Sequence, residues 1–166
     1  VIAKAAVQFA DLPDGQTAVS RQKQTGNCMD RDEFILDKNY DLIKWTRVCR
    51  EEGTDISSER KGNVLVVTGT LHSTKIEKEI ELGDKALHIY PGYSLSEFAM
   101  SGVKKINIWT LRRDKMDKLP MQAINKGEGT IVVNGKEVEV IKVYYSITPK
   151  IREGHFNHNY YFRKSD

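Results

Sequence analysis

Residues 129–140 read GTIVVNGKEVEV, and this stretch decides the fold. Two runs rich in β-branched residues flank Asn134 and Gly135. A two-residue type I′ turn needs a positive φ angle at both central positions, which Asn tolerates and Gly adopts without steric cost. The stretch therefore predicts a β-hairpin.

The return strand of this hairpin carries a change of phase. Its apolar residues stand at even positions up to Val140 and at odd positions from Ile141 to Ile147. Successive side chains on a strand point to opposite faces of the sheet. The pattern therefore predicts a β-bulge near Val140 and Ile141 that bends the sheet.

Short β-rich runs separated by turn residues make up most of the remaining chain, at spacings of about 8–12 residues. Gly69, inside a predicted strand at residues 64–71, indicates a bend or a bulge. One short helix is predicted where Ser94 to Glu97 fit a capping box, with Gly102 ending it. The fold class is therefore all-β, mainly an antiparallel meander, forming a curved sheet or half-open barrel with one short helix.

The composition predicts a single globular domain over residues 1–166, with 39% apolar and 30% charged residues. The net charge is +3, and basic and acidic residues are interleaved. This pattern is typical of a solvated surface, so nucleic acid is not expected as a partner. No apolar run approaches the roughly 20 residues of a transmembrane helix. The end, residues 160–166, resembles a strand entering a turn, so we expect a chain truncated at its C-terminus.

Cys28 and Cys49 lie on the two arms of a predicted hairpin with its turn at residues 37–40. Opposite charges favour the register in which Asp30 faces Arg47. The same register places the two cysteines directly opposite each other, with Cα atoms about 4.5 Å apart, near the lower end of disulfide reach. We predict a cross-strand disulfide. The alternative is two reduced, half-buried thiols in a cytosolic protein.

Four motifs carry a family resemblance: RKGNVLVVTGT at residues 60–70, IWTLRRD at 108–114, GEGTIVVNGKEV at 127–138 and YYFRKSD at 160–166. In this order they resemble a bacterial family of uncharacterised exported proteins. That family is similar, more distantly, to the half-open β-barrels of periplasmic lipoprotein carriers. The resemblance implies export to the periplasm or cell envelope and an incompletely closed barrel. Its motifs are strand and turn motifs, so it supplies no catalytic residue.

Candidate chemical groups are sparse. His155 and His158 would point to opposite faces of a regular strand, so solvated histidines are expected there and no metal or other cofactor is predicted. The chain lacks a Gly-x-Ser-x-Gly elbow and a Cys-x-x-Cys motif, which favours a protein that is not an enzyme. The charged stretch RRDKMDK at residues 112–118 could contact an anionic head group, but its acids favour a solvated loop.

Aromatic residues in the predicted strands are the remaining candidates for a functional site. Such residues belong either to the core or to an apolar ligand cavity. Trp45, Trp109 and Tyr145 are the predicted ligand-binding residues. The sequence thus favours an exported binding protein that holds a hydrophobic or lipid-like ligand. The alternative is an assembly or adaptor domain whose open sheet edge pairs with a protein partner.

Overall fold

A computed structural model describes residues 4–89, 91–148 and 157–164. The chain divides into two compact units. The first unit comprises Val1–Leu87 and Arg112–Asp117, and the second comprises His88–Leu111 and Lys118–Asp166. The single domain predicted over residues 1–166 stays a prediction.

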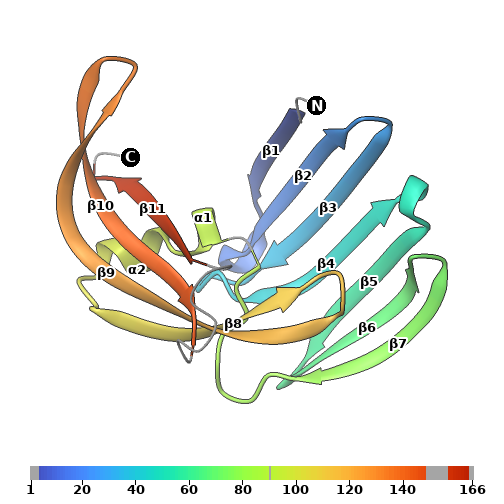
Figure 1. The fold of residues 1–166 in the computed structure, drawn as a ribbon. Helices are drawn as coiled ribbons and strands as arrows, with labels where there is room; N and C mark the ends of the chain where they lie inside the picture. Colours follow the sequence, from blue (N-terminus) through green and yellow to red (C-terminus); the bar gives the residue numbers. More distant parts are fainter. Residues whose placement is uncertain (1–3, 90, 149–156, 165–166) are drawn as a thin grey trace. The chain divides into compact units, whose positions relative to one another are not determined.

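The first unit contains a seven-stranded antiparallel sheet in which every strand pairs with the next one along the chain (Figure 1). This is the predicted meander. Its elements are β1 (Lys4–Asp11), η1 (Pro13–Gly15), β2 (Thr17–Thr25), β3 (Cys28–Leu36), β4 (Leu42–Cys49), η2 (Arg50–Glu52), β5 (Thr54–Lys61), β6 (Val64–Leu71) and β7 (Thr74–Glu81), where η marks a 3₁₀ turn.

The second unit contains a four-stranded sheet in the order β11-β10-β9-β8. Its elements are α1 (Pro91–Ser94), α2 (Ser96–Met100), β8 (Lys105–Arg112), β9 (Asp117–Val133), β10 (Lys136–Ile147) and β11 (Asn157–Arg163). Among the described residues both sheets are open, since each has two edge strands. The predicted all-β fold class is confirmed. Neither described helix has the length and apolar character that crossing a membrane requires.

The predicted hairpin is confirmed as the β9–β10 pair, with Asn134 at φ 51° and Gly135 at φ 76°. An irregularity at the predicted position is confirmed, because the register shifts between Ile141 and Val143, but the predicted bulge in the return strand itself is wrong. Ile141 pairs with Glu128 and Val143 pairs with Asn125, so two residues along β10 correspond to three along β9. The extra residue therefore lies on β9 beside Gly127, whose φ of 87° suits glycine.

The predicted capping box is wrong, although the short helix is present. Helix α2 has Leu95 as its N-cap residue and no side-chain capping bond. Ser94 instead ends α1 and is buried, while the Ser96 hydroxyl donates to the Tyr93 carbonyl at 2.7 Å. A buried Ser94 side chain and the preceding turn of α1 outweigh the local capping preference.

The β3–β4 register differs from the predicted one by two residues. Asp32 faces Arg47 and Phe34 faces Trp45. The cause is the connection: Asp37 accepts backbone hydrogen bonds from Asn39 and Asp41 at 2.8 and 2.9 Å, which closes a longer loop than a two-residue turn. A shift of two positions keeps every side chain on its face, so the burial pattern could not separate the two registers.

Each unit has a mainly apolar core, which is formed by the alternate residues of each strand that point inward. In β5, for example, Thr54, Ile56 and Ser58 are buried while the residues between them are exposed. The fully buried side chains of the first unit include Val19, Leu36, Leu42, Trp45, Ile56, Leu65, Val67, Leu82, Leu87 and Met116. Those of the second unit include Leu95 and Val140.

Gly69→Ala is expected to lower the free energy of unfolding by about 2 kcal/mol or more. Gly69 adopts a φ of 128°, and an added Cβ would overlap the backbone carbonyl oxygen of Asp55 on β5. The ladders with β5 and β7 run through Gly69 without a shift, so close backbone approach, and not the predicted bulge, requires the glycine. Urea unfolding measures the effect.

The matched control for Gly69 is Gly129→Ala in β9, where an added Cβ meets open space. This change should leave the free energy of unfolding within about 1 kcal/mol of the parent value. Equal losses at both positions would contradict the steric account of Gly69.

Candidate functional site

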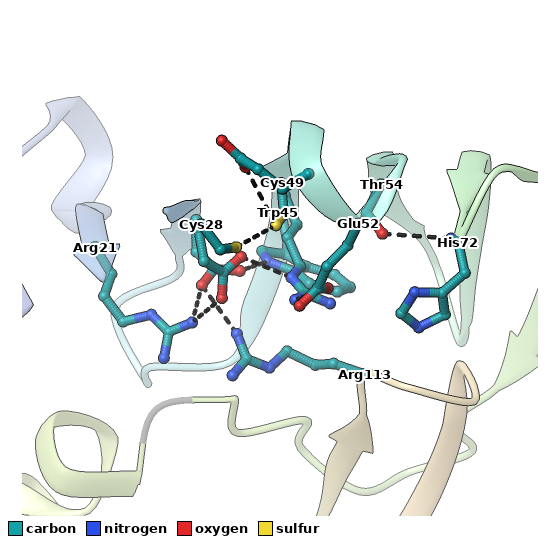
Figure 2. Close-up of polar contacts among 12 residues, drawn as sticks. Arg21, Cys28, Trp45, Cys49, Glu52, Thr54, His72 and Arg113 are labelled. Atoms are coloured by element: carbon teal, nitrogen blue, oxygen red, sulfur yellow. Dashed lines mark hydrogen bonds and ion pairs between the residues drawn. The ribbon is translucent and has the colours of Figure 1, made fainter. Parts of the chain in front are cut away.

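The candidate site is a cysteine pair beside a cluster of ion pairs on the core-facing side of β3 and β4 (Figure 2). Facing residues of an antiparallel pair share one side of the sheet. This side carries Cys28, Asp30 and Asp32 from β3 and Trp45, Arg47 and Cys49 from β4. We use the name charged cluster for Arg21, Asp30, Asp32, Arg47, Glu52 and Arg113.

Asp32 is the centre of the charged cluster, and its side chain is fully buried. Its carboxylate accepts hydrogen bonds from Trp45 Nε1 and Arg113 Nη1, both at 2.9 Å, and from Arg21 Nη2. Arg113 lies on the segment Arg112–Asp117, which belongs to the same unit. Charged partners and an indole donor together offset the cost of burying this carboxylate.

Asp30 links the centre of the cluster to its rim. It accepts from Arg47 Nε at 2.8 Å and from Arg21 Nη2 at 3.3 Å, and Arg47 Nη2 donates to Glu52 at 3.1 Å. Burial lowers the pKa of Arg47, but the hydrogen bond and charge of Asp30 outweigh it and hold the pKa above its ordinary value. Three guanidinium groups face three carboxylates, so the formal charges of the cluster cancel. This balance suits a structural role better than acid–base chemistry.

The cysteine pair lies at one end of the charged cluster. The Sγ atoms of Cys28 and Cys49 are 2.6 Å apart and share a hydrogen bond, and the Cys49 thiol lies 3.8 Å from Glu51 Oε2. The hydrogen bond with Cys49, burial and the carboxylates of Glu52 and Glu51 raise the pKa of Cys28 to about 12. The sulfur atoms are farther apart than the roughly 2.05 Å of a disulfide, so both residues are thiols in this structure. The predicted bridge stays a prediction.

Sulfur and carboxylate atoms of Cys28, Cys49 and Glu51 all lie within 4.8 Å of one another. Thiolate and carboxylate groups are known zinc ligands, but structural zinc sites normally take four ligands. The group supplies three, and one of them, Glu51, is exposed. His158, another candidate ligand from the sequence, is exposed in β11, and His155 lies outside the described residues.

The three predicted ligand-binding aromatics do not share one environment. Trp45 belongs to the first unit, is fully buried and stacks on Phe34 with ring centroids 6.4 Å apart. Trp109 and Tyr145 belong to the second unit. Trp109 is half-buried under Lys118 Nζ, which lies 4.5 Å from the ring centroid, and Tyr145 is buried. The structure therefore places Trp45 and Tyr145 in core positions.

Hollows open on the described surface, and the two of about 480 and 570 Å³ bear on ligand binding. One, of about 480 Å³, is lined by outward residues of β3, β4 and η2: Met29, Arg31, Glu33, Thr46, Val48, Arg50 and Glu51. The other, of about 570 Å³, lies along the β9–β10 hairpin and the end of β11 and is lined by Val133, Asn134, Lys136, Glu137, Val138, Glu139, Arg163 and Lys164. Neither hollow includes the aromatics predicted to bind a ligand.

The stretch at residues 112–118 is not the solvated loop that the sequence predicted. Met116 is fully buried and Arg113 binds Asp32. Arg112 pairs with Asp117, and this hydrogen bond raises the pKa of Arg112 and lowers that of Asp117. Sequence reasoning missed the link between Arg113 and Asp32, because the two residues are 81 positions apart and no local pattern relates them.

Tyr145 should make the free energy of unfolding depend on pH in the alkaline range. Burial raises its pKa above the ordinary value of about 10, and the Thr110 hydroxyl opposes this in part. The raised pKa means that the folded state holds the phenol proton more tightly than the unfolded state. This contribution to stability is fully present below about pH 10 and declines as the pH rises from there toward the folded pKa. Unfolding in urea at several alkaline pH values should show it.

Tyr145→Phe is the matched control for that measurement. The variant should lose less stability than the parent between neutral pH and about pH 11, because phenylalanine has no proton to release. Identical alkaline profiles for the two proteins would contradict the assignment to Tyr145.

No protein-family model and no curated protein sequence matches this chain. Among solved structures, the chain is similar to the crystal structure of a β-barrel-like protein of the domain of unknown function DUF1849 from Brucella abortus. The TM-score is 0.60 at 8% sequence identity, and the match covers 96% of this chain and 76% of that one. At this identity the likeness concerns the fold alone. The chain therefore has a β-barrel-like fold, in agreement with its open antiparallel sheets.

Proposed function

We propose that this protein is an exported binding protein of the periplasm or cell envelope that holds a hydrophobic or lipid-like ligand. Export rests on the family resemblance of the strand and turn motifs. The proposal is that the protein works by holding its ligand and not by transforming it.

The hollow beside the β9–β10 hairpin carries the proposal. Two of its lining side chains, Val133 and Val138, are apolar, and Val133 is 37% exposed. The rest are polar or charged: Asn134, Lys136, Glu137, Glu139, Arg163 and Lys164. Its volume of about 570 Å³ lies in the range typical of small-molecule sites, about 300–1,000 Å³. Its three basic side chains outnumber its two carboxylates, which suits an anionic head group, and the two valines offer contact to the apolar part of a lipid-like molecule.

Native mass spectrometry of the protein purified from its own host tests the proposal. A retained lipid-sized adduct is expected. A bare protein in repeated preparations would count against the ligand-holding function.

A pair of variants locates the binding. Val133→Asp places a charge in the hollow and should abolish the adduct, whereas Val132→Asp changes a neighbour that is 69% exposed and does not line the hollow. If both variants retained the adduct, the ligand would bind at another place on the protein.

A second candidate function, an assembly or adaptor domain, is favoured by edge strand β1. Among the described strands β1 pairs with β2 alone. It is eight residues long, and Ala5, Ala6, Gln8 and Ala10 are exposed on its two faces. Exposed edge strands with small apolar side chains accept a partner strand readily.

A photo-crosslinking residue at Ala5 tests the adaptor function in the native host, with one at the exposed Glu59 of β5 as the control. A defined protein adduct at position 5 alone would favour edge pairing. The same adducts at both positions, or none, would count against it.

A further inference from the structure

We propose that Cys28 and Cys49 are a reversible redox pair. Their oxidation to an intramolecular disulfide fastens the end of the β3–β4 ladder and stabilises the charged cluster that the reduced protein already forms beside it. This inference is independent of the ligand proposed above.

The geometry of the two sulfur atoms is the first support. They lie 2.6 Å apart and point toward each other. A small adjustment gives the bonded distance of about 2.05 Å. The observed register makes the cysteines diagonal neighbours on one side of the sheet, and not the directly opposed pair that the sequence predicted. The chain turns into η2 directly after Cys49.

The difference in burial between the two cysteines sets the order of events. Cys28 is half-buried and follows the turn between β2 and β3, whereas Cys49 is fully buried. The oxidant is a disulfide, either a small molecule or a protein. Such an oxidant reaches Cys28 first, because thiol–disulfide exchange requires access to the attacking sulfur.

Thiol–disulfide exchange then proceeds in two balanced steps. The Cys28 thiol gives its proton to solvent, and the thiolate attacks one sulfur of the oxidant. This forms a mixed disulfide and releases the other sulfur as a thiolate, which takes up a proton from solvent. The Cys49 thiol gives its proton to the Glu51 carboxylate, whose Oε2 lies 3.8 Å from Sγ, and the Cys49 sulfur attacks the Cys28 sulfur. The second sulfur of the oxidant leaves as a thiolate, and it takes up the proton from Glu51. The pair loses two protons and two electrons, and the oxidant disulfide gains both as two thiols.

Each cysteine is close in sequence to an acidic residue of the charged cluster. Asp30 lies two positions after Cys28, and Glu52 lies three positions after Cys49. Arg47 bridges them, with its Nε on Asp30 at 2.8 Å and its Nη2 on Glu52 at 3.1 Å. A bond between the two cysteines therefore holds both acids in place around one guanidinium group. Without it, as in this structure, Arg47 links the start of β3 to the η2 turn through these hydrogen bonds, which open more readily than a covalent bond.

Four groups around the Cys28 sulfur govern how quickly it reacts. Cys49 on β4, with Glu51 and Glu52 on η2, helps to raise the pKa of Cys28 to about 12, while Arg47 binds Glu52 nearby. The thiolate is therefore scarce at neutral pH. Oxidation by a disulfide should accelerate about tenfold for each pH unit between 7 and 9.

Equilibration in glutathione buffers tests the redox pair. The protein is quenched at a series of ratios of oxidised to reduced glutathione, alkylated with iodoacetamide and weighed by mass spectrometry. The expected result is one transition from a protein with two alkylated thiols to a protein with none. The mass of the unalkylated protein should be two hydrogen atoms lower than the mass calculated for the reduced chain. Three results would overturn the proposal: thiols that stay alkylatable at the most oxidising ratio, a stable glutathione adduct on Cys28, or thiols protected only by added zinc and released by a chelator.

Thermal unfolding and hydrogen exchange test the link to the charged cluster. Reductant should lower the Tm of the oxidised protein by roughly 6–12 °C and speed amide exchange in β3 and η2. The double variant Cys28→Ser with Cys49→Ser should not respond to reductant. A response of the double variant, or an oxidised parent that reductant leaves unchanged, would overturn the link. If the double variant does not fold, the exchange data on the parent alone decide.

Discussion

Replacing Asp32 by alanine is expected to lower the free energy of unfolding by about 3–5 kcal/mol. Its buried carboxylate accepts from Trp45 Nε1, Arg21 and Arg113, and the substitution leaves all three donors without this acceptor. Trp45 and Arg113 lose this acceptor, and Arg21 keeps only its longer contact with Asp30, so polar groups in a mostly buried cluster are left poorly paired. Chemical unfolding followed by circular dichroism measures the loss.

Two further variants separate charge from shape at this position. Asp32→Asn keeps an oxygen that can accept from Trp45 but removes the charge, so it should lose most of the same stability. Glu33→Ala is the control, because Glu33 is exposed on the opposite side of β3, and its effect should stay within about 0.5 kcal/mol. A loss of less than about 1 kcal/mol for Asp32→Ala would mean that the cluster contributes little to the fold.

Replacing Trp45 by alanine is expected to cost about 3–5 kcal/mol. The indole is fully buried, stacks on Phe34 and donates to Asp32, so its removal leaves a cavity and takes a donor from the buried carboxylate. Trp45→Phe restores most of the ring volume and should cost less, about 1–3 kcal/mol, for the lost hydrogen bond. The same unfolding experiment compares the two variants.

Trp109→Ala is the control for Trp45, since Trp109 is half-buried and should cost clearly less. The comparison also bears on ligand binding. If Trp45→Phe abolished a lipid adduct without loss of stability, Trp45 would be a ligand residue after all, and its core assignment would be wrong. Loss of stability with an unchanged adduct is the expected result.

The candidate site was predicted in part. The sequence indicated that Cys28 and Cys49 meet, and they do, although the charge pairing used to derive the register was off by two residues. The side chains still meet because a shift of two positions keeps them on the same side of the sheet. The charged cluster was not predicted as a unit. Its closure depends on Arg113, which reaches Asp32 from a segment distant in sequence.

The sequence by itself determined the local features of this protein: the Asn134–Gly135 hairpin, the irregular pairing after Val140 and the alternating strands of a meander. These follow from backbone conformations and side-chain alternation that neighbouring residues set among themselves. The tertiary structure alone decided which strand aromatics are core, which register β3 and β4 adopt, and that Arg113 closes on a buried Asp32. Those outcomes depend on burial and charge pairing between segments far apart in the chain, which no local pattern encodes.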